Sequence, residues 1–175
     1  MTPEIIYYVA CSLDGFIATE DGGVAWLEPF QRTGEDHGAA ELQASADALL
    51  LGSKTYEFAM KFGSWPSPNT PSWVFTGRRL KQLHPSIMLT SESPREVVEL
   101  LAARGLGRVW LMGGGKLATS FRTEGLISHY ILNVMPIILG RGIPVFAPGG
   151  PQRSLALESA KPFKSGIVQL NYKNA

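Results

Sequence analysis

Short runs of apolar residues, each ended by glycine, proline or polar residues, recur along the chain. The first run, from Ile5 to Cys11, consists mainly of β-branched and aromatic residues, which is typical of a strand buried on both faces of a sheet. We therefore expect a central strand there. Shorter runs predict further strands at residues 48–51, 73–76, 87–89 and 109–112. From Tyr130 onward the pattern predicts strands only, with turns at 140–142 and 148–151.

Helix-forming segments lie between these strands. Ser93, Pro94 and Glu96 combine an N-cap residue, a proline at the first helical position and an acid at the third, which predicts a helix that runs to Arg104. Further helices are expected at residues 35–46, 55–62 and 116–124, and residues 12–34 are expected to form a functional loop. Strands and helices alternate over most of the chain, which predicts an α/β fold with a mixed, mostly parallel sheet. The strands that follow one another at the end of the chain predict an antiparallel C-terminal hairpin.

Composition narrows the class of protein. The 175 residues are 45% hydrophobic and 18% charged, and no linker separates two compositions, so a single folded domain over residues 1–175 is expected. The net charge of +1, without a basic run, argues against nucleic acid as a partner. No apolar stretch approaches the roughly 20 residues of a membrane span, so we expect a cytoplasmic protein with no membrane partner. One cysteine and three scattered histidines exclude a disulfide framework and a structural zinc site.

A glycine-rich segment stands where a buried strand passes into a helix. It reads Met112-Gly113-Gly114-Gly115-Lys116. Backbone without Cβ atoms can approach an anion there, while the amides at the helix N-terminus point toward it, so a diphosphate is the expected ligand. A Walker A loop is excluded because Leu117 stands where Ser or Thr is required. The alternative is that the glycines only permit close packing of strand and helix.

Two other strand ends carry similar small, polar and cationic residues. These are Gly52-Ser53-Lys54-Thr55 and Thr76-Gly77-Arg78-Arg79. Because open α/β sheets bind ligands at the carboxyl ends of their strands, we expect the three strand ends to share a ligand with several phosphates. For each cation alone, a solvated surface position is the alternative.

Several other side chains are candidates for chemistry. Asp14 and Asp36 are the acids expected to be partly sheltered, although Asp36 could serve only as a helix cap. Cys11 is expected to be a buried small hydrophobe. Trp26, in the long loop, could form a wall of a ligand site. The histidines, His37, His84 and His129, are not expected to be catalytic.

Five segments in order carry a family resemblance: SLDGFIA at 12–18, LGSKTYE at 51–57, VFT at 74–76, LMGGG at 111–115 and PIILGRGIPVF at 136–146. Together they resemble the dihydrofolate reductase superfamily, and most closely its branch related to the C-terminal reductase domain of riboflavin biosynthesis. The resemblance covers residues 5 to about 146. It implies a dihydrofolate-reductase-like sheet of about eight strands with helices on both faces, and NADPH as the cofactor.

The resemblance also implies roles for individual residues. In the cofactor site, residues 113–117 would hold the diphosphate, Lys54 and Thr55 would add phosphate contacts, and residues 76–79 would surround the 2′-phosphate. Asp36 takes the place of the acid that contacts the pterin, and Leu132 falls near a substrate-contacting threonine. The expected cofactor-binding residues are Ala10 and Ile17 beside the nicotinamide, and Gly52, Ser53, Lys54, Thr55, Thr76, Gly77, Arg78, Arg79, Met112, Gly113, Gly114, Gly115, Lys116 and Leu117.

The resulting expectation is a reductase that moves hydride from NADPH to a C=N or C=O bond of a small pterin- or pyrimidine-type heterocycle. Asp36 is the expected catalytic acid, Asp14 the second candidate, and Trp26 and Leu132 the substrate contacts. The alternatives are a ribosylaminopyrimidine reductase of a riboflavin-type pathway and a non-catalytic module that binds NADPH or pterin. The resemblance implies a homodimer. Arg78 and Arg79 directly after a strand end predict a preference for NADPH over NADH.

Overall fold

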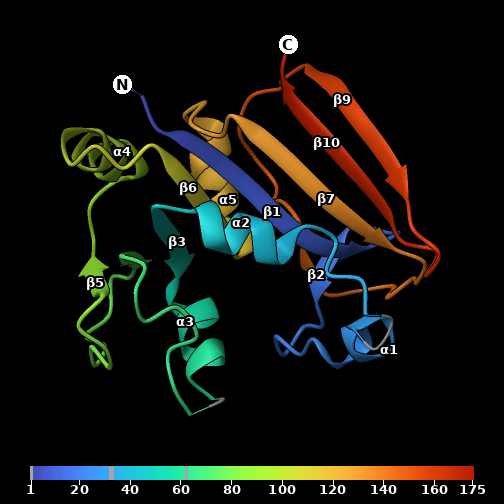
Figure 1. Cartoon of the computed structure of the whole chain (residues 1–175), viewed down its shortest axis with the longest axis horizontal. Coiled ribbons are helices and arrows are strands. Elements are labelled where there is room, and N and C mark those ends of the chain that lie inside the picture. Colours follow the sequence, from blue (N-terminus) through green and yellow to red (C-terminus); the bar gives the residue numbers. More distant parts are fainter. Residues whose placement is uncertain (1, 32–33, 62) are drawn as a thin grey trace.

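The computed structural model describes residues 2–31, 34–61 and 63–175, and its centre is an eight-stranded sheet (Figure 1). The strands follow the order β5-β4-β3-β6-β1-β7-β10-β9. They are β1 (Glu4–Ser12), β3 (Ala48–Gly52), β4 (Ser72–Phe75), β5 (Ile87–Thr90), β6 (Arg108–Gly113), β7 (His129–Met135), β9 (Leu155–Pro162) and β10 (Val168–Asn174).

The sheet is mixed and mostly parallel, as predicted. Strands β5, β4, β3, β6, β1 and β7 run parallel to one another, while β10 runs antiparallel to both β7 and β9. Strand β1 lies between β6 and β7, so the run of β-branched and aromatic residues predicted to be central is central. Ile5 and Tyr7 in this strand are fully buried. The continuous apolar run therefore reflects cover on both faces of the sheet.

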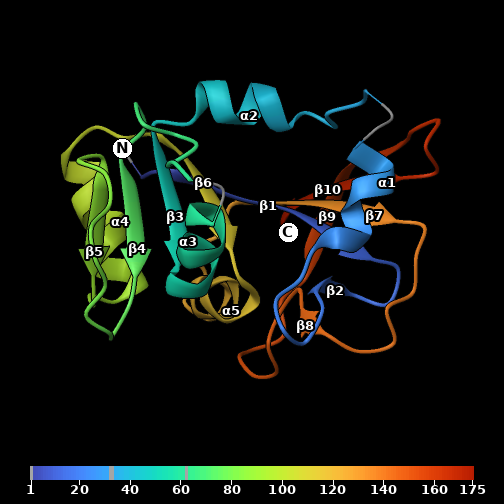
Figure 2. The ribbon, with the colours of Figure 1, turned by 90° about the horizontal axis from the view of Figure 1, so that it is seen from below.

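Helices cover both faces of the sheet (Figure 2). On one face, α3 (Ser53–Met60) packs a cluster that includes Leu49, Leu51 and Tyr56, and α2 (Ala39–Ser45) lies on the same side. On the other face, α4 (Pro94–Ala103) and α5 (Gly115–Thr123) bury the larger cluster around Leu111 and Phe121. Helix α4 begins with the predicted cap, because the Ser93 hydroxyl accepts from the Glu96 amide and the Glu96 carboxylate accepts from the Ser93 amide. Among the described residues, no helix has the length and apolar character that crossing a bilayer requires.

The long segment at residues 12–34 contains structure that the sequence did not predict. It includes β2 (Phe16–Ala18), the 3₁₀ helix η1 (Ala25–Leu27) and α1 (Glu28–Gln31). Strand β2 pairs with β8 (Ile143–Pro144) in a separate two-stranded sheet. The helix predicted from residue 35 starts only at Ala39, because His37 and Gly38 have positive φ angles of 54° and 85°. This part of the prediction was wrong, since a left-handed residue cannot continue an α-helix.

Candidate functional site

Three strand ends meet at one edge of the sheet. Leu51 of β3 is paired with Gly113 of β6, and Gly52 is paired with Phe75 of β4, so the segments that follow these strands begin side by side. Helix α3 leaves β3 toward one face and α5 leaves β6 toward the other, so the two chain segments diverge at these strand ends. We call the position between the ends of β3 and β6 the crevice. This is the topological switch point where open α/β sheets bind ligands.

The walls of this crevice come from segments that are distant in sequence. A methyl group on Gly114 would lie 3.7 Å from Ile17 Cδ1 and 3.8 Å from Thr55 Oγ1. A methyl group on Gly52 would lie 3.8 Å from the carbonyl oxygen of Gly113. The structure thus brings together Ile17, Gly52, Thr55 and the glycine segment, and their role in binding a cofactor stays a prediction.

Two helices present their N-termini to this crevice. Gly114 is the N-cap residue of α5 and Gly52 that of α3, and neither helix receives a side-chain capping bond. Glycine has no side chain that could accept from the first amides of a helix, so a bound anion can accept from them instead. The residue types at both strand ends therefore fit an anionic ligand.

The three glycines of the β6–α5 turn serve different purposes. Gly113 has a positive φ of 93° and is buried, and a methyl group there would lie 3.5 Å from Tyr7 Cε2. A methyl group on Gly115 would lie 2.2 Å from the carbonyl oxygen of Pro144, so this glycine permits close packing of the β8 segment. Gly114 has room for a methyl group and a φ of −71°. The packing alternative therefore explains Gly113 and Gly115, and Gly114 is the glycine that a ligand would explain.

Cationic side chains follow the same strand ends. Arg78 follows β4, and its Nη2 lies 2.7 Å from Glu57 Oε2 on α3. The Thr76 hydroxyl accepts from the Arg78 amide at 3.0 Å, which shapes the turn after β4. The predicted set also includes Lys54, Arg79, Lys116 and Leu117. The side chains of Lys54, Arg79 and Lys116 are exposed and have no carboxylate partner among the described residues. Sequence reasoning missed Glu57.

Asp14 is not sheltered, so this expectation was wrong. It is exposed, and its carboxylate accepts from the Ser12 hydroxyl at 2.6 Å and from the amides of Leu139 at 3.1 Å and Gly140 at 2.7 Å. These hydrogen bonds, that from Ser12 foremost, lower the pKa of Asp14. The ionised side chain joins the end of β1 to the 139–140 turn, which is a structural task.

Asp36 is also exposed, contrary to expectation. Its carboxylate accepts from the Gly38 amide at 3.1 Å and from the Ala40 amide at 3.0 Å, just before and within the first turn of α2. These bonds lower its pKa, so the group is an anion at neutral pH. The cap alternative is confirmed, and the anion can still accept hydrogen bonds from a ligand.

A hydrogen-bond network that sequence reasoning missed holds the Asp36 segment against the sheet. The Tyr8 hydroxyl donates to the carbonyl oxygen of His37 at 3.1 Å. Gln169 Nε2 donates to the same oxygen at 2.6 Å and to Asn133 Oδ1 at 2.9 Å. Burial raises the pKa of Tyr8, so its hydroxyl stays a donor. A buried asparagine inside the apolar run of β7 was the signal that could have drawn attention to this network.

Leu132 does not lie beside Asp36. It packs against the core cluster under α5, whereas its neighbour Asn133 is bonded to the network next to His37. Neighbouring residues of a strand point to opposite faces, so the predicted substrate contact lies one residue away from the side chain that faces the Asp36 segment. Trp26 is half-buried, and its buried Nε1 has no partner among the described residues. Ala10 is paired with Asn133 and thus lies on the same face as the network.

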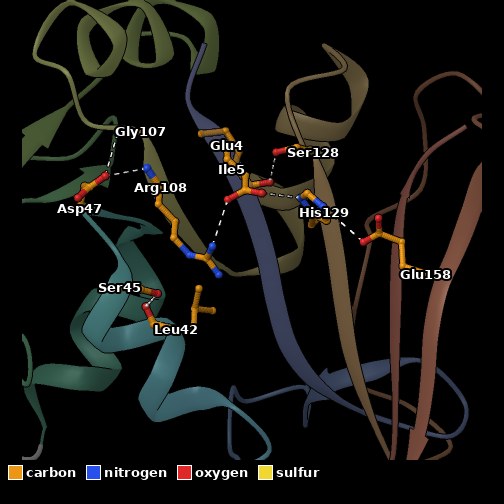
Figure 3. A network of polar contacts seen from close by, with 10 residues as sticks. All are labelled: Glu4, Ile5, Leu42, Ser45, Asp47, Gly107, Arg108, Ser128, His129 and Glu158. Atoms are coloured by element: carbon orange, nitrogen blue, oxygen red, sulfur yellow. Dashed lines mark hydrogen bonds and ion pairs between the residues drawn. The ribbon is translucent and has the colours of Figure 1, made fainter. Parts of the chain in front are cut away.

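Cys11, His84 and His129 lie outside the crevice and contact other parts of the protein. Cys11 is 3% exposed, and burial raises its pKa to about 11, so it is the buried hydrophobe that was predicted. His84 contacts Ser86 within a turn. His129 belongs to a polar network at the opposite edge of the sheet, where its Nδ1 lies 3.2 Å from Glu4 and its Nε2 lies 3.5 Å from Glu158 (Figure 3). This network is far along the strands from the crevice.

Comparisons with known proteins agree with this architecture. The family model of the RibD C-terminal domain matches residues 3–169. YwjB of Bacillus subtilis, an uncharacterized protein, is 32% identical over the full length of both chains. RibD of Mycobacterium tuberculosis is 29% identical over 153 residues, which are 79% of this chain and 43% of that protein.

Solved structures show the same fold. A Shewanella sp. PV-4 protein superposes with a TM-score of 0.89 at 24% identity over 98% of this chain and 99% of its own. The Thermotoga maritima diaminohydroxyphosphoribosylaminopyrimidine deaminase/5-amino-6-(5-phosphoribosylamino)uracil reductase gives a TM-score of 0.74 at 16% identity over 99% of this chain and 57% of its own. The expected reductase-like fold is confirmed, and the chain belongs to the RibD C-terminal domain family.

Proposed function

We propose that the protein is an NADPH-dependent reductase that transfers hydride to a C=N or C=O bond of a small pyrimidine- or pterin-type heterocycle. The observation that carries the proposal is the crevice between β3 and β6, where two helix N-termini without side-chain caps meet at Gly52 and Gly114. Family membership supports it, since the Thermotoga maritima relative is named as a uracil-derivative reductase.

The residues of the crevice fit a dinucleotide. The first amides of α5 and α3 would bind the diphosphate, and the space over Gly114, which a Cβ would fill, would admit it. Thr76, Arg78 and Arg79 would bind the 2′-phosphate, because guanidinium groups form charge-assisted bonds with phosphate oxygens. When bound, the nicotinamide supplies the hydride.

The substrate would lie on the face of the sheet that carries Ala10 and the Asp36 segment. Ionised Asp36 would accept hydrogen bonds from ring N–H or amino groups and orient the heterocycle. Trp26, half-buried in the segment after β2, would form a wall of the substrate site. Because the pKa of Asp36 is lowered in the free protein, orientation is its expected task, and proton donation falls to solvent or to the substrate.

Two alternatives remain distinguishable by experiment. A ribosylaminopyrimidine reductase would consume NADPH with a ribosylated aminopyrimidine but not with pterins. A non-catalytic binder would bind NADPH and leave it unchanged with every substrate. Titration of the protein with NADPH, followed by measurement of cofactor absorbance with a panel of pterins, pyrimidines and quinoid compounds, separates the three. Failure to bind NADPH would contradict the proposal.

The expected homodimer and the cytoplasmic location stay predictions. Strand β9 lies at the edge of the sheet and exposes Leu155 and Leu157. An edge strand with exposed leucines is compatible with pairing between subunits. Sedimentation of the purified chain measures the oligomeric state directly.

A further inference from the structure

We propose that Glu57 is a specificity-determining residue that limits the preference for NADPH over NADH by competing with the 2′-phosphate for Arg78. The inference rests on the proposed function. Its starting point is the 2.7 Å contact between Glu57 Oε2 and Arg78 Nη2, which joins the first turns of α3 to the turn after β4. Arg78 lies just after β4 and Glu57 lies on α3, the helix that follows β3, so the pair lies where the adenosine half of the cofactor would bind.

The Glu57–Arg78 pair is exposed and therefore easily rearranged. The side chains are 43% and 57% exposed, and exposed ion pairs contribute little because water screens them. A phosphate group can replace the carboxylate, since it offers several oxygens to the guanidinium group. The displaced Glu57 stays anchored on α3 close to the phosphate, so its negative charge opposes the exchange.

The same charge acts differently on NADH. Its 2′-hydroxyl is neutral and can donate a hydrogen bond to a carboxylate, which is how an acid in this region favours NAD over NADP in dinucleotide-binding proteins. Glu57 thus weakens binding of the phosphate without weakening binding of the hydroxyl. Lys54 and Arg79 carry no such partner among the described residues, so NADPH remains preferred.

The test compares Glu57→Gln with the wild-type protein by titration with NADPH and NADH. We expect Glu57→Gln to bind NADPH about 3- to 5-fold more tightly, as removal of an exposed ion-pair partner allows, while its affinity for NADH stays equal or falls. Adenosine 2′,5′-bisphosphate and adenosine 5′-monophosphate, used as probes, should show the same contrast. The gain in NADPH affinity should shrink at high salt. Glu99→Gln makes the same charge change on α4, away from the strand ends, and should alter neither affinity.

The outcomes separate the two proposals. An unchanged ratio of NADPH to NADH affinity in Glu57→Gln would overturn the role of Glu57. A lower ratio would overturn it as well, and would mean that Glu57 orients Arg78 toward the phosphate. Wild-type protein that binds NADPH well and prefers it over NADH leaves the proposed function standing in either case. Wild-type protein that binds neither cofactor would overturn both proposals, and melting temperatures of the variants exclude unfolding as the cause of any loss.

Discussion

The Tyr8 hydroxyl donates to the carbonyl oxygen of His37, and this contact joins strand β1 to the segment that carries Asp36. The same carbonyl oxygen accepts from Gln169 of β10, so two strands hold one peptide group. His37 has a positive φ, a conformation that is uncommon for non-glycine residues, and the two hydrogen bonds hold its peptide group in place. The position of Asp36 over the sheet therefore depends on residues far from it in sequence.

Removal of the Tyr8 hydroxyl tests this dependence. Tyr8→Phe should lower the free energy of unfolding by about 0.5–1.5 kcal/mol, the usual net contribution of one hydrogen bond. Urea denaturation with an unchanged m-value measures it. Tyr172→Phe is the matched control, because no hydrogen bond of the Tyr172 hydroxyl is found among the described residues. Equal stability of both variants would show that Gln169 alone holds the segment.

The cations after β4 are expected to decide cofactor choice. The double variant Arg78→Ala, Arg79→Ala should bind NADPH at least about tenfold more weakly, roughly 1.4 kcal/mol, because charge-assisted bonds to the 2′-phosphate are lost. Its affinity for NADH should not change. Arg95→Ala is the control, since Arg95 pairs with Glu124 at the end of α5. Equal wild-type affinities for NADH and NADPH would contradict the prediction.

Gly114 and Gly115 are expected to respond differently to the same substitution. Gly114→Ala fits the free protein and should keep its melting temperature, yet it should weaken NADPH binding at least about tenfold because the methyl group occupies the ligand's space. Gly115→Ala should lower the melting temperature strongly, since its methyl group would lie 2.2 Å from the Pro144 carbonyl oxygen. Thermal unfolding and NADPH titration of both variants make the comparison. Normal NADPH binding by Gly114→Ala would leave packing as the only role of the turn.

Substitution of Asp36 should lower turnover, whereas substitution of Asp14 should lower stability. Asp36→Asn should keep NADPH binding and lower turnover about 10²-fold on any substrate found, because the heterocycle loses the group that orients it. Hydrogen bonds from the Gly38 and Ala40 amides lower the pKa of Asp36, so the pH dependence of turnover between pH 5 and 8 should show no titration of this group. Steady-state kinetics at several pH values measures both. Full activity of Asp36→Asn would remove it from the site.

Asp14→Asn should act through the fold instead. The folded-state pKa of Asp14 is lowered, so its stabilising effect is present above the unfolded-state pKa and is lost as the pH falls through the folded-state value, below 3.8. The variant should therefore be less stable than the wild type at pH 7 and similar to it at strongly acid pH. Denaturation curves at the two pH values test this sign. A collapse of turnover at unchanged stability would transfer the catalytic role to Asp14.

Cys11 should be unreactive in the native protein. Its thiol is 3% exposed and its pKa is raised to about 11, so both access and thiolate formation are suppressed. Iodoacetamide at pH 8 should leave it unmodified until denaturant is added. The pKa of the thiol is higher in the folded state than in the unfolded state. The free energy of unfolding should therefore fall as the pH rises above about 9, where the thiol of the unfolded chain begins to ionise. Rapid native alkylation would contradict the buried position.

Sequence patterns were sufficient for the features that depend on residues close together in the chain. Continuous apolar runs predicted the strands, because a strand that is buried on both faces of the sheet has apolar residues at successive positions. Ser93, Pro94 and Glu96 marked the start of α4, because a capping box is complete within four residues. The order of strand ends and glycine segments predicted that these segments lie at one edge of the sheet, since parallel strands bring their carboxyl ends to the same edge.

Contacts between segments that are distant in the chain could be found only in the folded structure. The pairing of β2 with β8 involves strands of three and two residues, too short to leave a pattern of their own. The exposure of Asp14 and Asp36, and the ion pair of Arg78 with Glu57, depend on how whole elements pack. The prediction chose Leu132 as a substrate contact, but its neighbour Asn133 is the residue that faces the Asp36 segment. Alternate residues of a strand face opposite sides of the sheet, and the register of the folded sheet sets which of them face α2.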